Sequence, residues 1–371
     1  MLIKNFKIFF KYLFCAKWIF KSPKKNKFLV FDGEYVPFYK YINKNNITIL
    51  NRRFEEINFF ILLKCLINFK FSTLEYCKEF IKQVSPRLIL TGFDYHSIFY
   101  KLSLHTGIDT LMLQKGKRSK VDGIISESKK YISGKKNENF INYILLYNNK
   151  VKNFYKKKIN GKYFIIGSFE NNFKKLNKLQ QKKDIVFISN YSFKNKNKSE
   201  NEDLIAYKLY ELAKKNNLGF NILPRYRNDK IMLNSEIAFY KKKFTEKLNF
   251  IFDKNKTSYQ ILLNYKYVFA TYSTLAAEFL SKGGRVGFLM FKSKQNEAFH
   301  YRFGGYEGLA KSGPFWTSEN VINDKEIKRV FKYAIMTKES LWKKGVNLFG
   351  RKVIDYDFDN KVFQRIIKKY L

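Results

Sequence analysis

The sequence predicts an α/β protein of two doubly wound domains that face a cleft. Short apolar segments alternate with longer amphipathic ones, which is typical of parallel sheets buried on both faces. Residues 267–289 form a complete βαβ pattern of strand, polar turn, helix, glycine stop and second strand. A chain of 371 residues also exceeds one ordinary core and suits two domains.

The first domain, residues 1–170, is predicted from apolar runs that end in polar or glycine-rich turns. The expected strands are 27–31, 46–50, 87–91, 109–113, 143–147 and 163–166. The expected helices are 57–69, 73–84 and 97–105, the second ending before Pro86.

Residues 171–183 are polar and lysine-rich without apolar periodicity, which predicts a linker. The second domain, 184–335, repeats the alternation. Its expected strands are 184–189, 220–223, 249–252, 267–270 and 285–289, and its expected helices are 202–216, 235–247, 258–263, 274–281 and 326–338. Residues 303–307 and 313–317 suggest a glycine- and aromatic-rich loop, and 336–371 are expected to hold closing helices.

The chain is strongly basic, with 72 Lys and Arg against 31 Asp and Glu and a formal charge of +41. Such a charge favours nucleic acid or an anionic membrane as partner. The lysines, however, are spread along the whole length, which is typical of codon drift in an AT-rich genome. No zinc-finger spacing or RNP motif occurs. We therefore expect no nucleic-acid partner, and a basic nucleic-acid binder stays a remote alternative.

Cysteine and histidine usage limits the chemistry. The cysteines Cys15, Cys65 and Cys77 lack metal spacing and fit buried thiols in a reducing compartment. The three histidines are dispersed, so we expect no metal site. Dinucleotide, P-loop and hydrolase-elbow motifs are absent, and we expect no cofactor.

The N-terminal segment Leu2–Phe20 is apolar but interrupted by lysines, so it does not predict a spanning helix. Its lysine stripe and its phenylalanines predict a basic amphipathic helix lying in a membrane interface. We expect a cytoplasmic protein peripheral to the anionic inner membrane. A first helix packed on its own domain is the alternative.

Polar residues gather where predicted strands end, and ligands of doubly wound sheets bind at those ends. They are Asp32, Asp94, His96, Gln114, Arg225, Arg227, Ser273 and Thr274. Ser273 and Thr274 open a predicted helix whose free N–H groups suit a phosphate, and Glu278 lies on the same helix face, where it could bind a ribose. An ordinary βαβ unit with capping hydroxyls is the alternative.

Four short motifs resemble a known group. They are Thr91-Gly-Phe-Asp94, Leu113-Gln-Lys-Gly-Lys-Arg118, Ser273-Thr-Leu with Glu278 and Gly283, and Gly313-Pro-Phe-Trp-Thr317. The chain resembles bacterial surface-carbohydrate (polysaccharide or lipopolysaccharide) biosynthesis proteins of the two-Rossmann, GT-B glycosyltransferase type. Tyr95 and Lys115 stand where an Asn is common. The resemblance implies a nucleotide-sugar donor on the C-terminal domain and an acceptor on the N-terminal domain.

These expectations give each residue a role. Arg225 and Arg227 would bind donor phosphates, although a surface basic pair is the alternative. Asp94 is the first candidate for the base and His96 the second, while Asp94 could instead cap the next helix. Further polar contacts to acceptor or donor are expected from Asp32, Gln114, Lys115, Arg118 and Glu307.

The predicted function is metal-independent transfer of a hexosyl, sialyl or Kdo-type sugar to a surface glycan or lipid-linked glycan, as in lipopolysaccharide or capsule. The alternative is a nucleotide-sugar epimerase or a non-catalytic protein of the same fold, because fold does not fix function.

Overall fold

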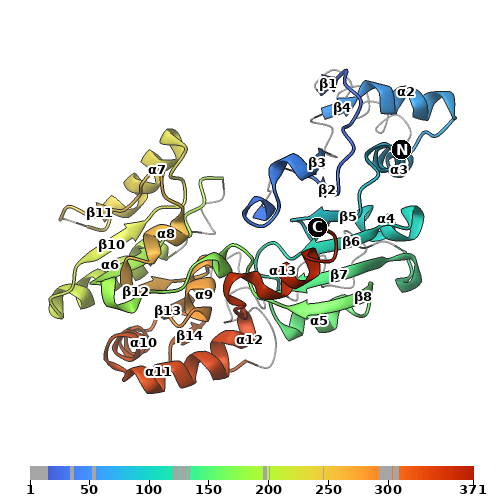
Figure 1. Ribbon diagram of the computed structural model, residues 1–371. Helices are drawn as coiled ribbons and strands as arrows, with labels where there is room; N and C mark the ends of the chain where they lie inside the picture. Colours follow the sequence, from blue (N-terminus) through green and yellow to red (C-terminus); the bar gives the residue numbers. More distant parts are fainter. Residues whose placement is uncertain are drawn as a thin grey trace. The chain divides into compact units, whose positions relative to one another are not determined.

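The computed structural model describes residues 16–33, 37–51, 56–119, 125, 132, 134–194, 199, 201–244, 246–291, 303 and 309–371. The chain divides into two compact units (Figure 1). Unit 1 consists of Met1–Lys115, Glu127–Glu170 and Asn360–Leu371, and unit 2 consists of Gly116–Ser126 and Asn171–Asp359. Each unit holds its own parallel sheet.

The described residues of unit 1 include a six-stranded parallel sheet of order β3-β2-β5-β6-β7-β8. Its strands are β2 (Phe28–Phe31), β3 (Ile47–Leu50), β5 (Leu88–Thr91), β6 (Asp109–Leu113), β7 (Phe140–Leu146) and β8 (Asn160–Ile165). The residues of β2 and β5 are fully buried, as expected for short continuous apolar strands inside a parallel sheet. The strand order reverses between β2 and β5, which is the topological switch point of this sheet.

The helices of unit 1 are α2 (Phe59–Ile67), α3 (Thr73–Val84), α4 (Phe99–Thr106), α5 (Asn149–Tyr155) and α13 (Lys361–Ile367). Most begin at polar caps; for example, the Ser72 hydroxyl accepts a hydrogen bond from the Glu75 N–H at the start of α3. Helix α13 returns from the far end of the chain. Its Phe363 is buried and stacks on Phe38, with ring centroids 5.7 Å apart.

In the described part of unit 2, a second six-stranded parallel sheet has the order β11-β10-β9-β12-β13-β14. Its strands are β9 (Lys182–Ile188), β10 (Phe220–Leu223), β11 (Asn249–Phe250), β12 (Tyr265–Ala270), β13 (Arg285–Phe291) and β14 (Trp316–Glu319). In chain order this is the 3-2-1-4-5-6 arrangement of a Rossmann sheet, and its switch point lies between β9 and β12.

Helices pack on both faces of the unit 2 sheet. They are α6 (Glu202–Lys215), α7 (Lys230–Lys241), α8 (Ser258–Leu262), α9 (Thr274–Ser281), α10 (Asp324–Met336), α11 (Glu339–Gly345) and α12 (Arg351–Val353). Phe187 and Phe269 of one sheet face join residues of α6, α7 and α10 in a single apolar core. Helices α8 and α9 instead contact β12, and α9 also contacts β13. The predicted α/β class with two Rossmann-like domains is confirmed.

The segment predicted as a linker, 171–183, begins where unit 2 begins, and part of it is structured. Asn171–Phe173 forms a 3-10 helix with Asn171 and Asn172 buried, and β9 already begins at Lys182. Asn171 Nδ2 donates to the Glu278 carbonyl at 2.8 Å, which ties this segment to α9. The expected group of closing helices is also divided, because α11 and α12 belong to unit 2 whereas residues 360–371 belong to unit 1.

The predicted N-terminal helix is wrong over its last residues. Lys17–Ile19 forms strand β1, which pairs in parallel with β4 (Glu56–Asn58). Residues 1–15, the rest of that prediction, lie outside the described residues. Trp316–Glu319 is a strand where we expected a loop. No helix in the described part of the chain combines the length and the apolarity needed to cross a bilayer.

Candidate functional site

Asp32 and His96 meet at the switch point of the unit 1 sheet. Asp32 follows β2 and His96 follows β5, and their Oδ2 and Nε2 atoms are 2.6 Å apart. Asp32 has φ 66°, a strained conformation for a residue with a side chain. Its N–H donates to the Leu50 carbonyl at 2.8 Å, and the Gly33 N–H donates to Asn51 Oδ1 at 3.1 Å. The turn that presents Asp32 is thus fixed to the end of β3.

His96 is held within an aromatic surround. Its ring lies near those of Phe31, Phe93 and Tyr95, at centroid distances of 5.9, 5.9 and 5.1 Å. The side chain is mostly buried and the Asp32 carboxylate is fully buried. The Asp32 carboxylate faces Nε2 as an ion-pair partner, with Oδ2 2.6 Å from that nitrogen, so it can offset a positive charge on the ring. This arrangement suits general-base chemistry.

Asp94 is a connecting residue in the structure. Its carboxylate is fully buried and accepts hydrogen bonds from the Lys115 N–H at 3.2 Å and from the Tyr155 hydroxyl at 2.7 Å. Its carbonyl accepts another from Tyr100 at 2.7 Å. The alternative that Asp94 caps the next helix is wrong, because the N-cap of α4 is Ile98 and no side chain caps this helix. Its role as a base stays a prediction, and the burial favours His96.

Gln114, Lys115 and Arg118, three further residues singled out in the sequence, follow the end of β6. Gln114 Oε1 accepts from the Tyr147 N–H at 2.8 Å, so Gln114 joins the ends of β6 and β7. Lys115 is exposed, and its Nζ lies 4.1 Å from the centroid of the Phe93 ring. Arg118 is half-buried and belongs to unit 2. Glu307 lies outside the described residues.

Ser273 and Thr274 begin α9 directly after β12, at the switch point of the unit 2 sheet. Ser273 is the N-cap, and its hydroxyl accepts from the Ala276 N–H at 3.3 Å. The start of α9 therefore presents N–H groups and a partial positive charge at the end of the sheet where ligands bind. Glu278 lies one turn further and is almost fully buried.

Arg225 and Arg227 follow β10 and line a pocket of about 250 Å³ that residues 225–229 form. The Arg225 guanidinium donates to the Tyr191 carbonyl at 3.3 Å, and that of Arg227 donates to the Lys256 carbonyl at 3.1 Å. Each bond uses one of five guanidinium N–H donors, so both side chains are oriented and retain donors for an anion.

Two buried carboxylates support this end of the unit 2 sheet, and the sequence analysis missed both. Glu236, fully buried, accepts from the N–H groups of Arg225 at 2.9 Å and Tyr226 at 3.0 Å, and so fixes the arginine turn. Glu202 accepts from the Asn190 N–H at 3.2 Å and from the Thr271 hydroxyl, which bridges the ends of β9 and β12.

Burial raises the pKa of Glu202 to about 7 and also raises the pKa of Glu236. The Tyr240 hydroxyl donates to Ser189 at 2.9 Å and to Glu202 at 3.3 Å, so it joins Glu202 to the end of β9. A signal for Glu236 was present in the sequence. Leu233, Glu236 and Tyr240 share the buried face of α7, so a glutamate occupies a core position of a helix.

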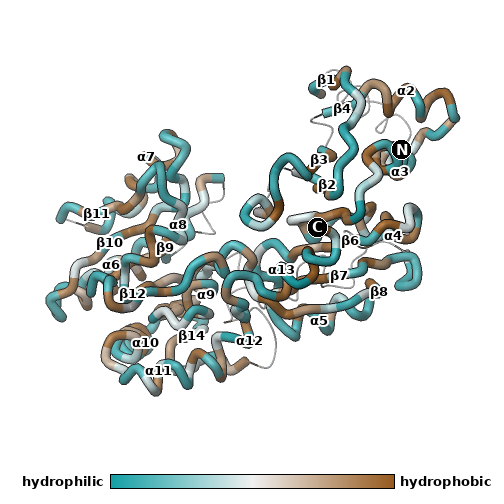
Figure 2. Tube along the Cα trace, in the orientation of Figure 1, coloured by the Kyte–Doolittle hydropathy of each residue, from teal (hydrophilic) through white to brown (hydrophobic). Residues whose placement is uncertain are grey.

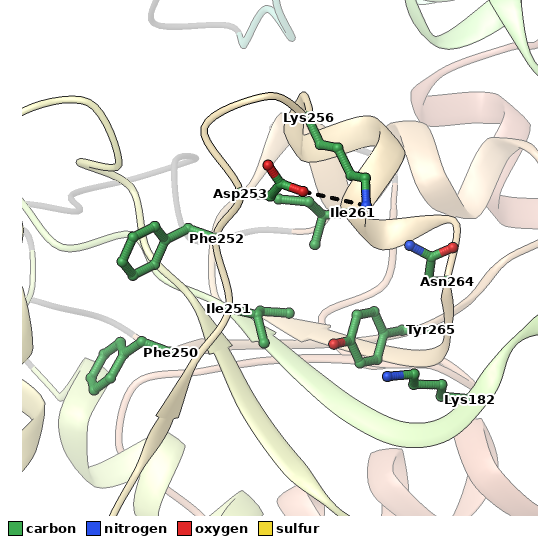
Figure 3. A pocket seen from close by; sticks show the side chains of 9 residues that line it. All are labelled: Lys182, Phe250, Ile251, Phe252, Asp253, Lys256, Ile261, Asn264 and Tyr265. Atoms are coloured by element: carbon green, nitrogen blue, oxygen red, sulfur yellow. Dashed lines mark ion pairs between the residues drawn. The ribbon is translucent and has the colours of Figure 1, made fainter.

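A second pocket of unit 2, of about 330 Å³, lies beside α8 (Figure 3). Ile251 and the Tyr265 ring face each other across it, and Lys182 lies below Tyr265. Asp253 and Lys256 form an ion pair of 3.3 Å at its rim. None of the residues predicted from the sequence is among the described side chains that line this pocket.

The described residues contain no group of three or more His, Cys, Asp or Glu side chains that could hold a metal ion.

The parallel sheets of the two units, each with its switch point, define an α/β protein with two Rossmann-like domains. Residues 111–371 match a protein family described as "putative O-antigen biosynthesis protein". This match covers more than half of the chain, and the chain belongs to that family. The predicted relation to surface-carbohydrate biosynthesis is confirmed. A search of curated proteins gives no match.

Several solved structures are similar at low identity. The accessory secretory protein 1, 2 and 3 structure of Streptococcus pneumoniae has 11% identity and a TM-score of 0.48, over 80% of this chain and 56% of that chain. The chain thus spans little more than half of that structure's chain.

The UDP-GlcNAc 2-epimerase of Methanocaldococcus jannaschii was solved with UDP-GlcNAc and UDP. It has 14% identity and a TM-score of 0.49, over 93% of this chain and 99% of that chain. Acinetobacter baumannii MurG has 10% identity and a TM-score of 0.48, over 93% of this chain and 99% of that chain. All three TM-scores are below 0.5, so the fold assignment rests on the observed strand orders.

Proposed function

We propose that the protein is a glycosyltransferase of the GT-B type that moves a sugar from a nucleotide-sugar donor to an acceptor in O-antigen or a similar surface glycan. The observation that carries the proposal is the Asp32–His96 pair, 2.6 Å apart at the switch point of unit 1. Membership of the O-antigen biosynthesis family supports the glycan substrate class.

The donor is assigned to unit 2. The N–H groups at the start of α9, together with Arg225 and Arg227, would bind the diphosphate and stabilise the charge that develops as it leaves. Glu278 would bind the ribose hydroxyl groups, as carboxylates beside anion sites do in nucleotide complexes.

The acceptor is assigned to unit 1. His96 takes the proton of an acceptor hydroxyl while that oxygen forms a bond to the anomeric carbon of the sugar. The bond from this carbon to the phosphate oxygen breaks, and its electron pair leaves with the nucleotide. Asp32, whose Oδ2 lies 2.6 Å from His96 Nε2, orients the imidazole and offsets the positive charge that it gains.

The base assignment is tested by His96→Gln, with exposed His105→Gln on α4 as the matched control. We expect His96→Gln to slow sugar transfer at least ~10²-fold and to leave nucleotide binding unchanged, because donor binding lies in unit 2. Transfer is measured with labelled nucleotide sugars as donors and, as acceptor, the surface-glycan fraction of the source bacterium.

The nucleotide is identified beforehand from the thermal midpoint of the protein with UDP, GDP, dTDP and CMP, since a ligand of the folded state raises that midpoint. Turnover of His96→Gln close to that of the wild type would exclude His96 as base and return attention to Asp94. Conversion of donor to its C2 epimer without acceptor would instead identify an epimerase.

We also propose that the protein is peripheral to the anionic inner membrane, where lipid-linked glycan acceptors would be reached. The basic, phenylalanine-rich composition of residues 2–20 supports this location.

A further inference from the structure

Helix α2 of unit 1 presents an apolar face to solvent. Its exposed side chains have exposed fractions between 38% and 67%: Phe59, Phe60, Leu63, Leu66 and Ile67. At 100° per residue they fall within an arc of roughly 120°. The buried residues Ile61 and Cys65 lie on the opposite side. Figure 2 shows the corresponding apolar colouring along α2. Helix α2 is therefore apolar on its exposed side as well as on its buried side.

Three further phenylalanines enlarge this surface. Phe20 is 64% exposed, and its ring centroid lies 5.4 Å from that of Phe59. Phe69 and Phe71 directly follow the helix and are 83% and 74% exposed. Their ring centroids lie 6.2 Å apart. We call these three residues and the five exposed side chains of α2 the α2 face. Contiguous exposed apolar surface of this kind marks a binding surface for another apolar phase.

Lysines border the α2 face. The Lys21 carbonyl accepts a hydrogen bond of 2.7 Å from Asn58, the N-cap of α2, so the exposed Lys21 lies at the start of the helix. Lys24 and Lys25 follow it and are also exposed. Lys64 lies on the flank of α2, and its Nζ donates to Gln83 at 2.9 Å.

Carboxylates near the α2 face are matched by other lysines. Glu56 lies 3.2 Å from Lys17 Nζ, and Glu75 lies 2.7 Å from Lys78 Nζ. The border of the α2 face therefore carries a positive excess from Lys21 and Lys64. An apolar centre rich in phenylalanine with a basic border is complementary to the acyl chains and anionic headgroups of a bilayer.

We propose that the α2 face is a docking surface for an anionic lipid bilayer. The phenylalanine rings would enter the boundary between headgroups and acyl chains, and the bordering lysines would contact anionic headgroups. This site lies on the folded body of unit 1 and, apart from Phe20, is distinct from the membrane segment expected at residues 2–20. It does not depend on sugar transfer, because binding to vesicles needs neither donor nor acceptor.

The test is co-sedimentation of the full chain with phosphatidylcholine vesicles that contain or lack 30% phosphatidylglycerol. We expect binding to the anionic vesicles that weakens with salt. The triple variant Phe59→Ser, Leu63→Ser and Ile67→Ser should bind them at least ~10-fold more weakly, since it removes apolar area from the lipid contact. Lys21→Ala with Lys64→Ala should weaken binding to the anionic vesicles and leave binding to the phosphatidylcholine vesicles unchanged.

The matched control replaces three exposed apolar residues of unit 2, Leu179, Ile231 and Val321, by serine. This control should bind vesicles as the wild type does. Circular dichroism and the thermal midpoint verify that each variant is folded.

Three results would overturn the proposal. The wild type could fail to bind anionic vesicles at low salt. The α2 variant could bind fully while deletion of residues 1–15 abolishes binding, which would locate the anchor in that segment. The wild type could also form a dimer that the α2 substitutions prevent without a change in vesicle binding, which would make the α2 face a contact between copies.

Discussion

At the scale of single residues, the buried carboxylates of unit 2 act through the shape they give to the donor end of the sheet. Glu236 fixes the backbone of Arg225 and Tyr226, and Glu202 joins the ends of β9 and β12 through Asn190 and Thr271. Neither is placed to contact a ligand directly. Their hydrogen bonds hold the turns from which the candidate phosphate-binding groups project, which is how supporting residues orient a site.

Glu202 gives the free energy of unfolding a pH dependence. Its ordinary pKa of 4.5 is raised to about 7 by burial, so the folded state keeps a proton that the unfolded state loses. The contribution of protonated Glu202 to the free energy of unfolding is therefore fully present below about pH 4.5. It is lost as the pH rises through about 7, by about 1.4 kcal/mol per unit of difference between the folded and unfolded pKa.

Glu202→Gln keeps the shape and removes the ionisation. Urea unfolding at pH 5, 6.5 and 8 should show a flatter dependence for this variant than for the wild type, and Glu211→Gln on the same helix is the control. Identical pH dependences for Glu202→Gln and the wild type would show that this carboxyl does not titrate over that range.

At the scale of elements, Arg329 of α10 fastens the turn that leads into β14. Its guanidinium donates to the carbonyls of Gly313 at 2.7 Å and Trp316 at 3.0 Å, and it forms two bonds with Glu326. This pairing lowers the pKa of Glu326 to about 2. At Gly313, a Cβ would collide with the Trp316 ring, so the turn admits only glycine in this conformation.

We expect Arg329→Ala to lower the free energy of unfolding by about 1–3 kcal/mol, because several backbone carbonyls lose their donor at once. Arg351→Ala, at an exposed position in the same unit, should change it by less than about 0.5 kcal/mol. Chemical denaturation measures both. Equal small effects would mean that water replaces the guanidinium at no loss.

At the scale of the whole molecule, the formal charge of +41 opposes compaction through self-repulsion. We expect the thermal midpoint to rise by several degrees between 50 and 500 mM NaCl, because salt screens this repulsion. Differential scanning calorimetry measures the change. A midpoint that falls with salt would show instead that the attractive surface pairs, such as Lys214 with Glu246, outweigh the excess of like charge.

Much of the fold could be predicted because its strands are short, continuous apolar runs. Strands predicted at 27–31 and 87–91 are found at Phe28–Phe31 and Leu88–Thr91. Lys17–Ile19 was missed because a strand this short lies within an apolar stretch whose lysine spacing favours a helix. Its partner strand lies about forty residues away, which a local pattern cannot indicate.

The candidate site was predictable where it depends on strand ends. Asp32 and His96 were singled out for that reason, and the structure brings them together. Tyr155 could not be found this way, because its contact with Asp94 crosses 61 positions of sequence. The inference that Asp94 is the base came from its position after a strand, and only the structure shows how deeply its carboxylate is buried.

The return of residues 360–371 to unit 1 has a consequence during synthesis. Asn360 Nδ2 donates to the Phe169 carbonyl at 2.9 Å, and Phe363 packs on Phe38 in the same core. These residues leave the ribosome after all of unit 2, so unit 1 waits through nearly two hundred further codons with its aromatic core uncovered, while unit 2 can already fold. A premature stop codon just before residue 360 would therefore damage the unit that was translated first.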